Sequence, residues 1–104
     1  LTKLSYPESV VVDMNDYMYI VDRGNNRIVR WAPNANSGVC IAACTGIVGT
    51  RADQFYFPIA VAFDNQGSLY VSDDGNNRVQ RFQILNSDNN FLINRLIEYN
   101  CRLF

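Results

Sequence analysis

The segment Asp22-Arg23-Gly24-Asn25-Asn26-Arg27-Ile28 returns 51 residues later as Asp73-Asp74-Gly75-Asn76-Asn77-Arg78-Val79. The similarity extends outward in both directions, so that residues 6–31 align with residues 57–82 without a gap. A fixed period of this size is typical of repeat proteins, in which each unit buries its apolar face only against a neighbouring unit. The sequence therefore predicts two consecutive structural units of the same kind.

Length and composition fit one small globular domain. The chain has 104 residues, of which 48% are hydrophobic, and its formal net charge is −1. This charge argues against nucleic acid as the favoured partner, because phosphate binding usually needs a basic excess or a basic face. No apolar run is long enough to span a membrane, and no signal-peptide pattern occurs. The sequence assigns no cell compartment.

Each repeat carries the same order of strand signals. In each repeat a proline, Pro7 or Pro58, precedes an unbroken apolar run that ends in an aspartate; the runs are residues 10–12 and residues 59–63. Because neither run alternates with polar residues, we expect these strands to be buried on both faces. Residues 18–21 and 69–72 follow as second strands, since they are rich in β-branched and aromatic residues.

The repeated Asp-x-Gly-Asn-Asn-Arg segments predict tight reversals after the second strands. Glycine and asparagine tolerate positive φ, and an aspartate carboxylate accepts hydrogen bonds from nearby backbone amides. The arginine that closes each segment can pair with the aspartate that opens it. The residues assigned to this structural role are Asp22, Gly24, Asn25, Asn26, Arg27, Asp73, Gly75, Asn76, Asn77 and Arg78. Calcium is the weaker interpretation, because the ordered acidic positions of a calcium loop are missing.

Third and fourth strands complete each unit. The third strands are predicted at residues 27–31 and 78–82, and a fourth strand of the first unit at residues 39–47. Residues 83–104 are assigned by position to the fourth strand of the second unit, although their apolar spacing also fits a helix. Four short antiparallel strands with a buried inner strand are typical of a β-propeller blade.

Three cysteines, Cys40, Cys44 and Cys101, form an odd set, whereas a disulfide framework normally uses an even number. If Cys40 and Cys44 lie on one strand, their side chains are about 13 Å apart at ~3.3 Å per residue. That separation is too long for a disulfide. The chain contains no histidine and no four-ligand zinc pattern. Small buried or half-buried thiols are therefore the favoured interpretation.

The two units resemble the NHL repeat. The first unit matches its pattern at Pro7, Val10, Asp13, Tyr19, Asp22, Gly24, Asn25, Asn26, Arg27, Ile28 and Trp31. The second unit matches at Pro58, Val61, Asp64, Tyr70, Val71, Asp73, Gly75, Asn76, Asn77, Arg78, Val79 and Phe82. The resemblance implies an all-β fold of two four-stranded antiparallel blades, part of a six-bladed propeller.

The resemblance also divides the chain. Residues 1–5 are the end of a preceding unit or a linker, residues 6–49 the first blade, residues 50–56 the inter-blade loop and residues 57–104 the second blade with an atypical tail. Two blades cannot close a ring. We therefore expect either a fragment of a longer propeller or self-association through the open blade faces.

The resemblance implies a non-catalytic binding scaffold, most often for proteins. Loops that differ between the units are expected to give specificity. Their candidate binding residues are Asn15, Asp16, Tyr17, Asn34, Asn36, Arg51 and Asp53. We predict no catalytic, cofactor or metal-binding residues, because the chain lacks histidine and its cysteines have no orienting base.

Two alternatives remain open. The first is an RNA-binding face built from Arg23, Arg27, Arg30, Arg51, Arg78 and Arg81, with Tyr17, Trp31, Tyr56 and Phe82 as stacking partners. The second is part of a metal-dependent propeller lyase or lactonase, an activity that some propellers have. The missing histidine weakens the second alternative.

Overall fold

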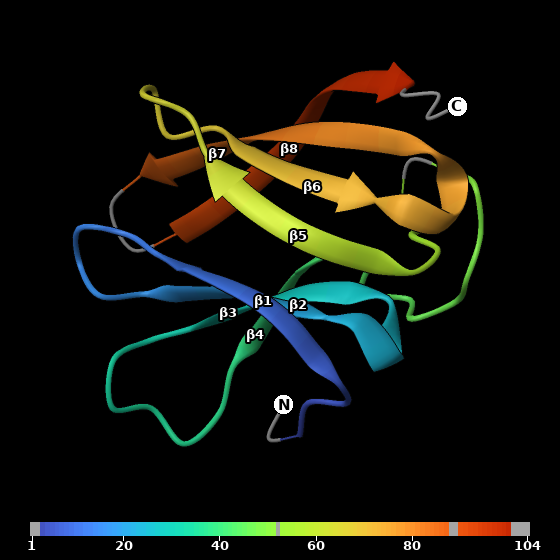
Figure 1. The fold of residues 1–104 in the computed structure, drawn as a ribbon. Coiled ribbons are helices and arrows are strands. Elements are labelled where there is room, and N and C mark those ends of the chain that lie inside the picture. Colours follow the sequence, from blue (N-terminus) through green and yellow to red (C-terminus); the bar gives the residue numbers. More distant parts are fainter. Residues whose placement is uncertain (1–2, 52, 88–89, 101–104) are drawn as a thin grey trace.

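The protein folds into two antiparallel β-sheets, as a computed structural model shows (Figure 1). The structure describes residues 3–51, 53–87 and 90–100, with side chains described up to residue 83. Each sheet has four strands in sequential order, β1-β2-β3-β4 in blade 1 and β5-β6-β7-β8 in blade 2. The predicted all-β fold of two four-stranded antiparallel units is therefore confirmed.

The strands and turns of the two blades correspond closely. Blade 1 consists of β1 (Pro7–Val12), β2 (Met18–Asp22), the 3-10 turn η1 (Arg23–Asn25), β3 (Arg27–Trp31) and β4 (Val39–Ala42). Blade 2 consists of β5 (Pro58–Phe63), β6 (Leu69–Asp73), the 3-10 turn η2 (Asp74–Asn76), β7 (Arg78–Ser87) and β8 (Asn90–Asn100). No helix among the described residues is long and apolar enough to cross a membrane.

Both ends of the blades are shaped by aspartates at repeat-equivalent positions. Asp13 accepts hydrogen bonds from the amides of Asn15 (2.8 Å) and Tyr17 (3.0 Å). Asp64 accepts hydrogen bonds in the same way from Gln66 and Ser68, both at 2.9 Å. These turns form the hairpin end of the blades (residues 13–17 and 64–68), and the Asp-x-Gly-Asn-Asn-Arg turns form the opposite, η end (residues 22–27 and 73–78).

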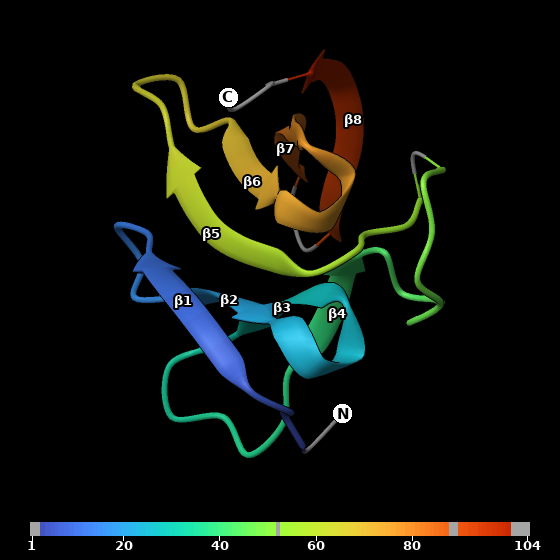
Figure 2. The same cartoon turned by 45° about the vertical axis from the view of Figure 1, so that its right-hand side comes forward.

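The core lies between the two sheets, which stack face to face (Figure 2). Blade 1 contributes its packed face, Val11, Tyr19, Val21 and Ile28. Blade 2 contributes its packed face, Val61, Phe63, Leu69 and Phe82. The Tyr19 and Phe63 rings meet edge to face with centroids 4.9 Å apart. Phe55, from the segment between the blades, is fully buried in the same cluster.

Neither innermost strand is buried on both faces, so that prediction is wrong for β1 and also for β5, where Ala60 and Ala62 are exposed. Val10 and Val12 are 53% and 55% exposed, although the equivalent Val61 is 6% exposed. The physical reason is that each blade packs against the other on one face in this structure. Repeat proteins bury an apolar face by stacking a neighbour on it, and blade 1 has a neighbour on one side in this structure.

Two strand boundaries also differ from the predictions. Strand β4 ends at Ala42 instead of residue 47, because Ala43 has a positive φ of 55° and begins a turn closed by the bond from the Gly46 amide to the Ala43 carbonyl. Strand β7 continues to Ser87 instead of residue 82, because it pairs along its length with β8. The assignment of the tail to a fourth strand is confirmed for residues 90–100, whereas residues 101–104 lie outside the described residues.

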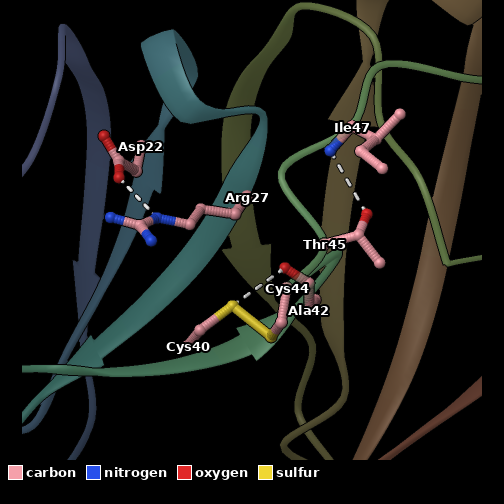
Figure 3. The surroundings of a disulfide bond; sticks show 7 residues. All are labelled: Asp22, Arg27, Cys40, Ala42, Cys44, Thr45 and Ile47. Atoms are coloured by element: carbon pink, nitrogen blue, oxygen red, sulfur yellow. Dashed lines mark hydrogen bonds and ion pairs between the residues drawn. A yellow bond between two sulfur atoms is a disulfide. The ribbon is translucent and has the colours of Figure 1, made fainter. Parts of the chain in front are cut away.

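A disulfide joins Cys40 and Cys44, which overturns the expectation of free thiols at these positions (Figure 3). The spacing argument assumed a continuous strand. Because β4 ends at Ala42 and the chain turns at Ala43, the two Cα atoms lie 5.7 Å apart, within the range that a disulfide spans. Cys101 lies outside the described residues.

Candidate functional site

The turn of blade 2 is built around a buried carboxylate. Asp73 is fully buried and accepts hydrogen bonds from the amide of Tyr56 (2.7 Å), Nδ2 of Asn76 (2.8 Å) and Nε of Arg78 (2.7 Å). Three donors around one carboxylate satisfy the charge that burial would otherwise leave unpaired. The cluster therefore holds the turn and the segment that precedes β5 in one arrangement.

The arginine of this cluster also holds the inter-blade loop. Arg78 donates from Nη1 to the carbonyl of Thr50 (2.6 Å) and from Nη2 to the carbonyls of Arg51 (2.9 Å) and Gln54 (2.7 Å). Its side chain is only 4% exposed. Because these donors are committed to the backbone and to Asp73, the guanidinium has a structural role.

Blade 1 repeats the carboxylate cluster. Asp22 accepts hydrogen bonds from the amide of Ser5 (2.7 Å) and Nδ2 of Asn25 (2.9 Å). It also accepts one from Nε of Arg27 (2.7 Å; Figure 3). Among the described residues, Arg27 donates to the carbonyl of Lys3 (3.1 Å), the repeat equivalent of Gln54, and its side chain is 17% exposed. The two turns therefore share their carboxylate geometry and this contact of the arginine with the preceding segment.

The glycine of each turn is required by a close backbone approach. The amide of Gly24 donates to the Ser5 carbonyl (2.7 Å), and the amide of Gly75 donates to the Tyr56 carbonyl (2.8 Å). A Cβ atom at Gly75 would lie 2.5 Å from the Tyr56 carbonyl oxygen, and one at Gly24 would lie 2.7 Å from the Ser5 oxygen. The asparagines after these turns, Asn26 and Asn77, adopt left-handed conformations, as the pattern predicts.

An exposed aromatic surface lies beside the turn of blade 1. It consists of Tyr6, Arg23, Val48, Tyr56 and Phe57, which line a groove of about 320 Å³. The Arg23 guanidinium lies 4.5 Å from the Phe57 ring centroid and 5.7 Å from that of Tyr6. Tyr6, Tyr56 and Phe57 remain 72%, 48% and 44% exposed. Rings and a guanidinium in this arrangement can bind a partner by stacking and by apolar contact.

The backbone at this surface is unusual. Tyr6 and Phe57 have φ values of 49° and 59°, which are rare for bulky residues. Hydrogen bonds to Asp22 and Asp73 hold the residues just before them, and Oδ1 of Asn26 accepts a hydrogen bond from the Phe57 amide (3.1 Å). The last bond connects blade 1 directly to the start of blade 2. The surrounding contacts thus maintain a conformation that projects the two rings outward.

The predicted binding loops lie at two opposite ends of the blades. The loops with Asn15, Asp16 and Tyr17 and with Asn34 and Asn36 lie at the hairpin end, whereas Arg51 and Asp53 lie at the η end. Within these loops, the Arg30 guanidinium lies 3.6 Å from the Tyr17 ring centroid. Arg51 and Asp53 form an exposed ion pair at 3.3 Å. The structure therefore does not bring the predicted residues into one site.

A second groove, of about 480 Å³, lies at the hairpin end between the turns of the two blades. Its carboxylates serve the turns, and the hydroxyls of Tyr19 and Tyr70 donate to Asp13 and Asp64, each at 3.0 Å. Burial raises the pKa of Tyr19 above its ordinary value of 10.0. The amide of Ser68 lowers the pKa of Asp64 below 3.8. Among the described residues, no three His, Cys, Asp or Glu side chains group in a way that could hold a metal ion.

Several residues named for RNA binding are occupied elsewhere. Phe82 is 5% exposed and belongs to the core, and Arg78 is bound to backbone carbonyls. Trp31 donates from Nε1 to the Ala35 carbonyl (2.7 Å). Arg81 and Arg30 approach the rings of neighbouring tyrosines, with Arg81 6.0 Å from the Tyr70 centroid.

The aromatic surface was only partly visible in the sequence. Tyr56 was named as a stacking residue and Arg23 as a basic residue, but Tyr6, Phe57 and Val48 were not assigned to a site. One signal was available, because Tyr6 and Phe57 are aromatic at equivalent positions directly before the repeated proline. The positive φ values that turn these rings toward solvent are a property of the folded backbone.

Comparison with known families identifies the repeat. Residues 55–82 match the family model of the NHL repeat. The matched segment runs from the buried Phe55 through β5, β6 and η2 to Phe82 in β7. No curated protein matched the chain. The resemblance to NHL repeats is therefore confirmed, and it coincides with a blade of the observed fold.

Proposed function

We propose that this chain is part of an NHL-type β-propeller of six blades that acts as a non-catalytic scaffold for protein binding. The partner binds at the η end, on the aromatic surface of Tyr6, Arg23, Val48, Tyr56 and Phe57. The observation that carries this proposal is the exposure of three aromatic rings in one groove, two of which, Tyr6 and Phe57, lie against the Arg23 guanidinium. Aromatic residues and arginine are the residue types that dominate binding energy at protein interfaces.

The backbone at Tyr6 and Phe57 supports this proposal. Positive φ at a bulky residue costs on the order of 1–3 kcal/mol, and such strain is concentrated at functional sites. Because the fold maintains the conformation in both blades, the rings are already ordered before a partner arrives. A preordered surface loses less entropy on binding.

The charges of the repeat favour protein over RNA or a reacting substrate. Asp22, Asp73, Arg27 and Arg78 bind one another and the backbone. Because these groups stabilise the turns, they are unsuited to phosphate binding or proton transfer. Arg23 is the arginine best placed at the aromatic surface, and it also pairs with Glu8 at 3.4 Å.

The proposal is tested by affinity capture with the chain from cells that express it, in comparison with a double variant, Tyr6→Ser with Phe57→Ser. We expect the double variant to lose the specific partner, and we expect nuclease treatment to leave capture unchanged. Met14→Ser is the matched control, because Met14 is 99% exposed at the opposite, hairpin end. Circular dichroism checks that all three proteins fold alike.

Three results would contradict the proposal. Capture of the same proteins by the double variant would place the binding site elsewhere. RNA retention that falls steeply with salt would favour the nucleic-acid alternative. Stoichiometric metal after dialysis together with turnover of a substrate would favour the lyase or lactonase alternative.

A further inference from the structure

We propose that copies of this chain associate head to tail, so that the open face of blade 1 packs on the open face of blade 2 of the next copy. This inference rests on the proposed propeller architecture, and it identifies a second copy of the chain as the partner that covers the two open sheet faces. The open face of blade 1 carries Val10, Val12, Met18 and Trp31 beside Ile20 and Val29, which are already buried within the single chain. The open face of blade 2 consists of Ala62, Tyr70, Ser72 and Val79.

The interface between the blades within one chain supplies the template. There the packed face of blade 1 meets the packed face of blade 2, and Tyr19 packs edge to face on Phe63. The two surfaces that meet come from opposite sides of the repeat unit. A contact between two different surfaces is heterologous. The pair of blades therefore keeps one uncovered surface of each kind, one on either outer side.

The unused surfaces reproduce the template residue by residue. The residues on the open face of blade 1 are the repeat equivalents of those on the packed face of blade 2. Val10 corresponds to Val61, Val12 to Phe63, Met18 to Leu69 and Trp31 to Phe82. The open face of blade 2 occupies those of the packed face of blade 1, with Ala62 for Val11, Tyr70 for Tyr19, Ser72 for Val21 and Val79 for Ile28. All but one of these positions stay apolar or aromatic, the exception being Ser72.

Burial differs at some equivalent positions of the open and packed faces, although Ile20 and Val29 are buried like their equivalents Val71 and Gln80. Val61 is 6% exposed, whereas Val10 on the open face is 53% exposed. Tyr19 is 2% exposed, whereas Tyr70 is only half-buried. A groove of about 290 Å³ on the open face is lined partly by Leu4, Val10 and Met18. Leu4 stands at the repeat position of Phe55, which is fully buried at the template interface.

Polar groups at the η end fit the same arrangement. Within the chain, Asn26 accepts a hydrogen bond from the Phe57 amide across the two blades. Asn77 and Tyr6 are the repeat equivalents of these residues, Asn77 has the same left-handed conformation, and both are exposed. We expect Asn77 of one copy to accept a hydrogen bond from the Tyr6 amide of the next. A second copy therefore offers the first both a matching apolar face and this backbone hydrogen bond.

Head-to-tail contacts repeat until they close a ring or continue as a filament. If the ring has six blades, three two-blade chains close it. We therefore expect light scattering to give a folded species with about three times the 11.8 kDa mass of the chain. The emission of Trp31 should shift to shorter wavelength as the concentration rises, because assembly covers the open face of blade 1.

Two variants separate this arrangement from other modes of association. Val10→Arg places a charge on the open face of blade 1, and Ala62→Arg places one on the open face of blade 2; both residues are exposed in the single chain. We expect each variant alone to be a folded monomer. A mixture should form a one-to-one dimer that grows no further, because each variant retains the face that the other has lost. Met14→Arg, at the hairpin end, should assemble like the unchanged chain.

Several outcomes would overturn the inference. A folded monomer of the unchanged chain at high concentration would do so, as would a mixture of the two variants that stays monomeric. A dimer of either variant alone would indicate that like faces pack on like faces. Indefinite aggregation that persists in both variants would indicate nonspecific association. Failure of assembly with partner capture still dependent on Tyr6 and Phe57 would overturn this inference and leave the protein-binding proposal standing.

Discussion

The two Asp-x-Gly-Asn-Asn-Arg turns have almost the same sequence and the same carboxylate geometry, but different surroundings. In blade 2, Arg78 donates to three carbonyls of the inter-blade loop and is 4% exposed. In the described part of blade 1, Arg27 donates to the carbonyl of Lys3, the repeat equivalent of Gln54, and is 17% exposed. The guanidinium of such a turn is therefore bound by carbonyls of the segment that precedes the blade.

The largest effect is expected when the aspartate of the buried turn is removed. Asp73→Ala leaves the Arg78 guanidinium buried without its carboxylate, and this change should lower the free energy of unfolding by about 3–5 kcal/mol. Asp22→Ala should cost only about 2 kcal/mol, because water can reach part of Arg27. Urea denaturation of both variants measures the difference. Equal losses, or unchanged stability of Asp73→Ala together with loss of a bound metal, would contradict a structural role.

The disulfide sharpens the comparison, because Cys40 pairs with Val29 in blade 1, whereas Glu98 pairs with the equivalent Gln80 in blade 2. Replacing both Cys40 and Cys44 by serine should lower the free energy of unfolding by about 2 kcal/mol, as the loop-closure model gives for a five-residue loop. Thermal unfolding with and without a reducing agent measures this effect. The double variant is its own control, since reductant should leave its melting temperature unchanged. An equal effect of reductant on both proteins would rule out this disulfide as the cause.

A smaller effect of opposite sign is expected at Gln80, which is fully buried in blade 2. Neither polar atom of its amide has a hydrogen-bond partner in the part of the chain that the structure describes, and blade 1 has Val29 at this position. Because an unsatisfied buried amide is costly, Gln80→Leu should raise the free energy of unfolding by about 1 kcal/mol. Urea denaturation tests this, with Val29→Leu as the matched control. A destabilised Gln80→Leu would show that the amide is satisfied in the folded protein.

The smallest effect is a pH dependence at the β5–β6 turn. The Ser68 amide lowers the pKa of Asp64 in the folded state, so the stabilisation is complete above the ordinary pKa of 3.8 and is lost as the pH falls through the folded value. Asp64→Asn should therefore weaken the dependence of stability on pH below about 4. Thermal unfolding between pH 5 and pH 2 measures the two profiles. Parallel profiles would show that this carboxyl does not contribute.

Much of the fold was readable from the repeat itself. Glycine, asparagine and aspartate at fixed positions dictated the turns through their local backbone chemistry, and the turns fixed the order and pairing of the strands. The aromatic surface was harder to predict from the sequence. The rings of Tyr6 and Phe57 are placed by positive φ values and by backbone hydrogen bonds that span 17 to 31 positions, which no local pattern encodes.

The sequence by itself determined the two-blade repeat, the turn carboxylates and the all-β fold, because each depends on residues close together in the chain. Tertiary structure alone decided which face of each blade is covered, why Val10 is exposed and Val61 is buried, and that Cys40 and Cys44 are joined. Burial is a property of neighbours: identical positions in two repeats have different surroundings when only one of them has a blade packed against it.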